Sequence, residues 1–151
     1  TSGTNKNDSS AQAVQDQHAV LDLIASQGLC DRADELGRRF GAAVQPADWS
    51  ALPGLLARAS LLVNTTSLGM TGQPPLPIDL GPLSAHAVVT DLVYVPLKTS
   101  LLAAAEAQGL ATADGLGMLL HQAVRGFELW FGVRPQVTAE LRRLVETDLA
   151  K

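Results

Sequence analysis

Residues 87–109 read AVVTDLVYVPLKTSLLAAAEAQG, and this stretch decides the fold class. Its first nine residues are rich in β-branched side chains, which predicts a strand over residues 87–95 that Pro96 terminates. A helix is expected over residues 99–108, because Thr99 can cap its first turn and Gly109 can end it. A strand that leads directly into a helix is typical of an α/β domain with a largely parallel sheet.

The same alternation continues on both sides of this stretch. Downstream we expect a short strand over residues 111–113 and a helix over residues 115–131. A last helix should begin at Thr138, with one apolar side formed by Leu141, Leu144, Val145 and Leu149. Upstream we expect one or two helical turns over residues 52–59, a strand over residues 61–63 and a loop over residues 71–77. Residues 61–63 are wholly apolar, which predicts a strand buried on both faces.

The N-terminal third is less regular. Residues 1–10 are polar without apolar periodicity, so a flexible head is expected. Apolar residues then recur at near-helical spacing and predict a helix that ends near Gly28; they are Ala13, Val14, Ala19, Val20, Leu21, Leu23 and Ile24. A second helix is expected over residues 31–40, followed by a short strand over residues 42–44.

The overall composition excludes several classes of protein. With 151 residues, of which 46% are hydrophobic, the chain can form one ordinary domain core. A net charge of -4 argues against a nucleic-acid binder. Its single cysteine, Cys30, fits a reducing cytoplasm, and we see neither a signal peptide nor an apolar run long enough to span a membrane. His18 and His86 lack partners at metal-ligand spacing, so no metal site is expected.

Three segments place polar or glycine residues directly after an expected strand. The first, residues 64–70, supplies Asn64 and three hydroxyl side chains, and Gly69 allows the backbone to turn. In open α/β sheets, ligands bind where strands pass into loops at their carboxyl ends. The segment is therefore a candidate binding loop, although a turn that only caps a helix would have the same composition.

The second and third segments leave the same choice between function and structure. Asp91 lies within an apolar strand, and we favour a structural carboxylate that binds backbone amides over a catalytic group. Tyr94 lies three residues further on and can offer its hydroxyl to a ligand.

In the third segment, residues 114–122, Gly115 and Gly117 open the helix over residues 115–131 and let a flat ligand approach the backbone. Gln122 suits a polyhydroxylated substrate, but it could be one exposed residue of an amphipathic helix.

Together these segments resemble the shikimate dehydrogenase family. The resemblance rests on NTTSLGM at 64–70, DLVYVPLKT at 91–99, DGLGMLLHQ at 114–122 and FELWFG at 127–132. It implies a Rossmann-like parallel sheet flanked by helices, incomplete at its N-terminal side, with C-terminal helices. It also implies an NADP-binding domain over residues 11–133 and a helix over residues 134–151 that packs on a substrate domain.

The resemblance further implies reversible hydride transfer between NADPH and 3-dehydroshikimate in a cytoplasmic enzyme of the shikimate pathway. The implied cofactor-binding residues are Asn64, Thr66, Ser67, Val93, Gly115 and Met118, and the implied substrate-binding residues are Tyr94 and Gln122. The partner would be a small molecule, shikimate or 3-dehydroshikimate, rather than nucleic acid or membrane, and a homodimer is one option for assembly.

Upstream of residue 60 the sequence departs from the family pattern. The family's glycine-rich loop is missing, and residues 28–31 leave no room for the strand expected before the helix over residues 31–40. The family's segments with a catalytic Lys and a catalytic Asp are also absent, so the catalytic residues stay unassigned. Two alternatives therefore remain open: a non-catalytic nucleotide-binding module, and a related dehydrogenase that uses quinate or another cyclic polyol.

Overall fold

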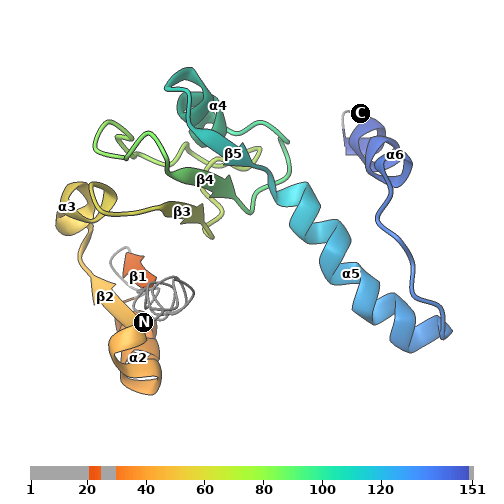
Figure 1. The fold of residues 1–151 in the computed structure, drawn as a ribbon, viewed down its shortest axis with the longest axis horizontal. Coiled ribbons are helices and arrows are strands. Elements are labelled where there is room, and N and C mark those ends of the chain that lie inside the picture. Colours follow the sequence, from red (N-terminus) through yellow and green to blue (C-terminus); the bar gives the residue numbers. More distant parts are fainter. Residues whose placement is uncertain (1–20, 25–29, 150–151) are drawn as a thin grey trace, which may run out of the picture. The chain divides into compact units, whose positions relative to one another are not determined.

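The computed structural model describes residues 21–24 and 30–149. The chain separates into two compact units, residues 1–55 and residues 56–151. Figure 1 shows the elements of both units along the chain. The expected flexible head over residues 1–10 lies outside the described residues.

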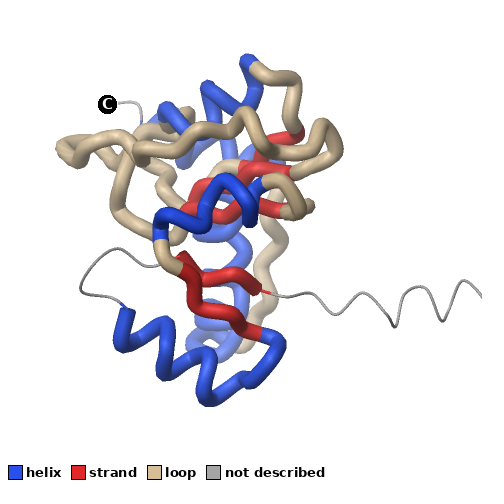
Figure 2. Tube along the Cα trace, turned by 90° about the vertical axis from the view of Figure 1, so that its left-hand side faces the viewer, coloured by secondary structure: helices blue, strands red, loops and turns tan. Residues whose placement is uncertain are grey.

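The first unit contains a two-stranded parallel sheet. Strand β1 (Leu21–Ile24) pairs with β2 (Val44–Ala47), and helix α2 (Cys30–Phe40) lies between them in sequence. The two strands lie side by side with α2 along them (Figure 2). Helix and strand approach closely, since a Cβ at Gly37 would meet Pro46 Cδ at 2.8 Å. Two short 3-10 turns, η1 (Gly41–Ala43) and η2 (Trp49–Ala51), and helix α3 (Leu52–Leu56) follow α2 and β2.

Three expectations for this unit are wrong. Residues 21–24 form a strand rather than the end of a helix, because they pair in parallel with residues 44–47. A strand therefore does precede the helix over residues 31–40, and it lies upstream of Gly28. The expected strand over residues 42–44 begins only at Val44, since Gly41 has a positive φ of 60° and opens a 3-10 turn. The rest of the expected helix, residues 11–20 and 25–28, lies outside the described residues.

The second unit is built on a three-stranded parallel sheet in the order β3-β4-β5. The strands are β3 (Leu61–Asn64), β4 (Val88–Asp91) and β5 (Ala111–Ala113). Helix α4 (Ser100–Ala107) connects β4 to β5, and Thr99 caps it as expected. Val89 of β4 and Ala105 of α4 are fully buried, so the core of this unit lies between the sheet and α4.

Two longer helices complete the second unit. Helix α5 (Gly115–Phe131) has the expected bounds, and it ends at Gly132, whose φ of 69° is left-handed. Helix α6 (Ala139–Leu149) follows one residue after the expected start. The expectation of a parallel sheet flanked by helices, with further helices at the C-terminus, is confirmed.

The strands of this unit differ from expectation in length and burial. Strand β4 ends at Asp91 instead of residue 95, because the Asp91 carboxylate accepts a hydrogen bond from the backbone N–H of Val93 and turns the chain. Strand β3 is not buried on both faces, since Leu61 is 55% exposed. It is the edge strand of its sheet, so only one side pairs with another described strand.

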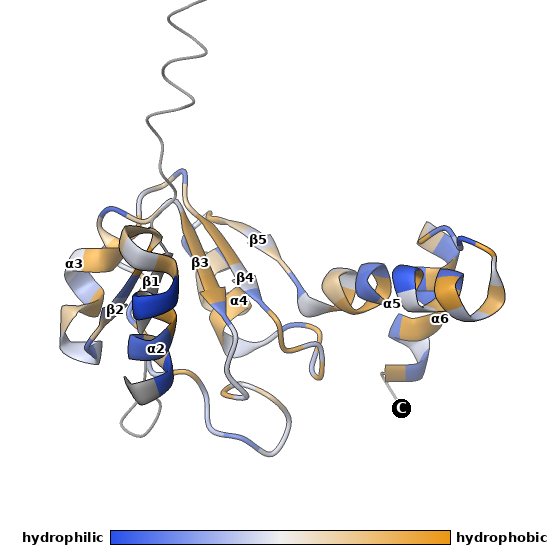
Figure 3. Cartoon of the chain, turned by 90° about the horizontal axis from the view of Figure 1, so that it is seen from below, coloured by the Kyte–Doolittle hydropathy of each residue, from blue (hydrophilic) through white to orange (hydrophobic). Residues whose placement is uncertain are grey.

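Helices α5 and α6 carry large apolar side chains on their surfaces. Trp130 is 80% exposed and Leu144 is 64% exposed. Figure 3 shows hydrophobic residues along both helices. Among the described residues, no helix combines the length and the apolar character needed to cross a membrane.

Candidate functional site

The polar residues of all three sequence segments follow the carboxyl ends of parallel strands. Asn64 ends β3, Asp91 ends β4, and Asp114 directly follows β5. Asn64 and Asp91 are partners in the strand register. The parallel arrangement therefore brings these ends to one edge of the sheet, where α/β proteins bind ligands.

Asn64 organises the loop that follows β3. Its side-chain amide donates to the backbone oxygen of Leu68 and to Asp91 Oδ1, both at 3.0 Å. Its amide oxygen accepts from the backbone N–H of Thr66 at 3.0 Å and from the Thr66 hydroxyl at 2.8 Å. Asn64 is 3% exposed, and these four bonds use its full hydrogen-bonding capacity. Its side chain therefore acts on the shape of the loop.

Asp91 connects this loop to the next helix. Besides Asn64, its carboxylate accepts from the backbone N–H of Val93 at 3.0 Å and from the Thr99 hydroxyl at 2.7 Å. Thr99 in turn accepts from the backbone N–H of Leu102 in the first turn of α4. Asp91 and Thr99 are fully buried. This geometry agrees with a structural carboxylate, but only one of the three bonds goes to a backbone amide, and the other two go to the side chains of Asn64 and Thr99.

Gly115 packs α5 against the exit of β4. A Cβ at this position would lie 2.3 Å from the backbone oxygen of Leu92 and 2.9 Å from that of Asp91. No side chain fits there, so the glycine is required for the close approach of two backbones. The start of α5 and the end of β4 are thereby held in contact.

An ion-pair cluster covers the first turn of α5. Asp114 caps the helix by accepting from the backbone N–H of Leu116 and of Gly117. Arg142 of α6 donates to Asp114 Oδ2 at 2.6 Å and, through its Nε, to Glu146 Oε1 at 2.7 Å. The hydrogen bond to Asp114 is the main cause that raises the pKa of Arg142 above its usual range. The ion pair therefore favours the charged form of the guanidinium.

Comparison with known proteins places these elements in a family. Residues 115–144 match the family model for the shikimate 5'-dehydrogenase C-terminal domain. Over 134 residues, or 89% of the chain, the sequence is 71% identical to a protein from Rhodopseudomonas palustris strain TIE-1 named shikimate dehydrogenase (NADP(+)). The chain is therefore similar in sequence to members of the shikimate dehydrogenase family. The match covers 48% of that relative, so the chain spans about half the length of the curated relatives it matches.

Solved structures of similar fold support this assignment. A quinate dehydrogenase from Corynebacterium glutamicum in complex with NAD is 31% identical, with a TM-score of 0.74 over 97% of this chain and 53% of that one. A shikimate 5-dehydrogenase from Thermus thermophilus in complex with NADP(H) and shikimate is 28% identical, with a TM-score of 0.66 over 85% of this chain and 44% of that one. The expected Rossmann-like fold is confirmed.

The structure brings only some of the family-implied site residues into direct connection. Asn64 and Val93 both bond to Asp91, and Gly115 packs on Leu92 beside it. Val93 is buried, whereas Thr66 and Ser67 are exposed on the loop after β3. Tyr94 is half-buried; Met118 and Gln122 are exposed on α5. Gln122 lies seven residues after Gly115, which is about two helical turns.

Sequence reasoning missed the contribution of α6 to this edge. Arg142 reaches Asp114, 28 residues away in sequence. In the sequence it reads as one of two adjacent arginines in an amphipathic helix. No local pattern marks it, because its partner is determined by how α6 folds back on α5.

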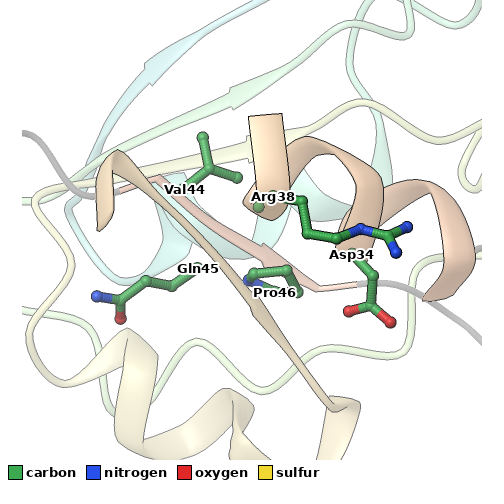
Figure 4. A pocket seen from close by; sticks show the side chains of 6 residues that line it. Asp34, Arg38, Val44, Gln45 and Pro46 are labelled. Carbon is green, nitrogen blue, oxygen red and sulfur yellow. The ribbon is translucent and has the colours of Figure 1, made fainter. Parts of the chain in front are cut away.

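A surface pocket in the first unit does not coincide with this edge. Residues of α2 and β2 line it: Asp34, Gly37, Arg38, Val44, Gln45 and Pro46 (Figure 4). None of them belongs to the three strand-exit segments. Within the described ranges, 21–24 and 30–149, no group of three or more His, Cys, Asp or Glu side chains could hold a metal ion.

Proposed function

We propose that this chain is the NADP-binding half of a shikimate dehydrogenase, which reversibly reduces 3-dehydroshikimate to shikimate with NADPH. The identity of 71% over 134 residues to a shikimate dehydrogenase (NADP(+)) carries the proposal. The bonded edge of β3 and β4, with α5 packed against it, supports the proposal, since it supplies a rigid ligand-binding edge. A cytoplasmic location and a role in the shikimate pathway form part of the same proposal.

The described residues at this edge fit the nicotinamide end of the cofactor better than its phosphates. Asp114 already occupies the free amides at the start of α5, so this helix terminus is closed to a phosphate. Exposed hydroxyls on the loop after β3 and the exposed apolar side chain of Met118 suit a ribose and a flat ring. When bound, the cofactor supplies the hydride, and the protein positions it.

Each implied site residue takes a role consistent with its burial. Val93, Gly115 and Met118 form the apolar surface beside the ring, and Thr66 and Ser67 lie on the loop toward the ribose. Tyr94 and Gln122 present polar groups to the substrate. Asn64 acts differently from the other residues, because its amide is fully bonded within the protein and shapes the loop rather than contacting the ligand.

A chimeric enzyme tests the proposal. We expect the 151-residue chain alone to bind NADPH without turnover, because its sequence lacks a Lys/Asp pair that could move the hydroxyl proton. When the chain replaces the matching 134 residues of the Rhodopseudomonas palustris relative, NADP-dependent oxidation of shikimate should remain within about tenfold of that relative. Steady-state kinetics by absorbance measure this rate.

Two neighbouring residues on α5 supply a matched control in the chimera. Gln122→Ala should raise KM for shikimate about tenfold, because a polar contact to a hydroxyl is lost. His121→Ala, at the adjacent exposed position, should leave the kinetics unchanged. A chimera that binds NADPH but never turns over would support the alternative of a non-catalytic nucleotide-binding module.

Quinate with NAD is a second candidate pair of ligands. The quinate dehydrogenase in complex with NAD is 31% identical to the chain and has a TM-score of 0.74. The ratio of kcat/KM for shikimate with NADP to that for quinate with NAD separates the two. A ratio below one in the chimera would favour quinate.

The exposed apolar surface of α5 and α6 leads to a proposal about domains. We propose that the segment over residues 134–151 packs on a substrate domain. The 151-residue chain should then bind a hydrophobic dye such as ANS, because Trp130, Leu129 and Leu144 are more than half exposed. A sedimentation run that shows a compact monomer without dye binding would contradict this proposal.

A further inference from the structure

The cluster of Asp114, Arg142 and Glu146 is not used by the proposed function. We propose that Arg142 is a positioning residue that holds α6 at the N-cap of α5 and cancels the charge of Asp114 beside the candidate nucleotide site. This inference rests on the proposed function, because the charge of Asp114 matters only if an anionic dinucleotide approaches this edge.

Capping alone does not need a charged residue at position 114. The cap consists of one side-chain oxygen that accepts from two backbone amides, and asparagine caps helices as well as aspartate does. A carboxylate here adds a negative charge at the edge where the nicotinamide end of the proposed cofactor approaches, and that cofactor is an anion as a whole because of its phosphates. An ion pair with Arg142 offsets part of the resulting longer-range repulsion.

The geometry of Arg142 fits this role. Its guanidinium lies over the first turn of α5, since a Cβ at Gly117 would be 3.9 Å from Nη1. Its Nη2 bonds to Asp114, and its Nε bonds to Glu146, one turn along α6. Both carboxylates therefore share the one guanidinium, which offsets one of their two negative charges. The bond to Asp114 also ties α6 to the start of α5.

The neighbouring arginine offers a matched control. Arg143 is exposed, and its Nε bonds only weakly to the backbone oxygen of Ala139 in the same helix, at 3.4 Å. Replacing it removes the same charge from α6 but leaves the pair with Asp114 intact. A general effect of net charge would therefore appear equally in Arg142→Ala and Arg143→Ala.

Titration of the full 151-residue chain with NADPH, followed by nucleotide fluorescence, tests the cancelled charge. Arg142→Ala should weaken NADPH binding about fivefold at low salt and less at high salt, because salt screens the unmasked carboxylate. Asp114→Asn added to Arg142→Ala should restore binding to within about twofold, since asparagine caps without charge. Arg143→Ala should bind like the wild type.

Amide hydrogen exchange tests the anchoring without ligand. Amides of α6 should exchange faster in Arg142→Ala, both with and without Asp114→Asn, while Leu116 and Gly117 stay protected by the cap. Unchanged exchange in α6 would overturn the proposal that Arg142 holds α6 at the start of α5. The proposal that Arg142 offsets the charge of Asp114 would be overturned by equal NADPH affinity in the wild type and Arg142→Ala. It would also be overturned by a loss of affinity that Asp114→Asn does not restore. If the wild type binds no NADPH, the proposed function fails instead, and exchange still decides the anchoring.

Discussion

Replacing Gly115 with alanine is expected to lower the free energy of unfolding by about 3 kcal/mol. The new Cβ would lie 2.3 Å from the backbone oxygen of Leu92, and no rotamer change can relieve contact with a main-chain atom. Either α5 or the exit of β4 must move. Thermal unfolding monitored by circular dichroism should show a melting temperature lower by about 10 °C.

Gly117 is the matched control for this substitution. It lies two residues further along the same helix, where a Cβ would meet only Arg142 Nη1 at 3.9 Å, an ordinary contact. Gly117→Ala should therefore be neutral or stabilise the chain by up to about 1 kcal/mol, since alanine favours helix. Equal stability of the two variants would show that β4 and α5 do not approach as closely as described.

Replacing Asp91 with alanine should cost about 4 kcal/mol of unfolding free energy, the largest loss expected for a single polar side chain of the described edge. The substitution leaves three donors without their acceptor: the Asn64 amide, the Val93 N–H and the Thr99 hydroxyl. These groups are in a buried site where water cannot replace the carboxylate easily. Chemical denaturation measures the loss.

Two further variants show whether the loss of stability in Asp91→Ala comes from its hydrogen bonds or simply from removing a carboxylate. Asp91→Asn keeps one acceptor oxygen for Asn64 and Val93, so it should cost only about 1 kcal/mol. Asp79→Ala removes an exposed aspartate that bonds only to the backbone N–H of Gly81, and it should cost less than about 0.5 kcal/mol. If Asp91→Ala were as mild as Asp79→Ala, Asp91 would not connect the loop after β3 to α4.

Structural elements that are marked by capping or turn residues close to them in sequence were predicted well. Helices α4 and α5 have a capping residue at the start and a glycine at the end, so their bounds could be predicted nearly to the residue. The structural role of Asp91 followed from a charged side chain in an apolar strand. These features depend on neighbours within a few positions, which a single sequence displays.

Two of the misses depend on contacts that a local pattern does not display. Residues 21–24 became a strand through pairing with residues 44–47. Leu61 is exposed because the side chain points to a face of the sheet that is left uncovered at this position, which an apolar run by itself does not reveal. A stretch of four residues with three apolar side chains, such as Leu21–Ile24, is compatible with either a helix or a strand until its partner is known. The end of β4 at Asp91 was also missed, because a side chain rather than Pro96 turns the chain.

The sequence by itself determined the α/β class, the two capped helices and the three strand-exit segments, because capping, turn and periodicity signals are local. Only the tertiary structure decided which groups meet at the sheet edge: Asn64 on Asp91, Gly115 against the Leu92 carbonyl, and Arg142 on Asp114. The physical reason is that each of these contacts joins elements whose closeness arises from strand register and helix packing, and neither is written in the residues between them.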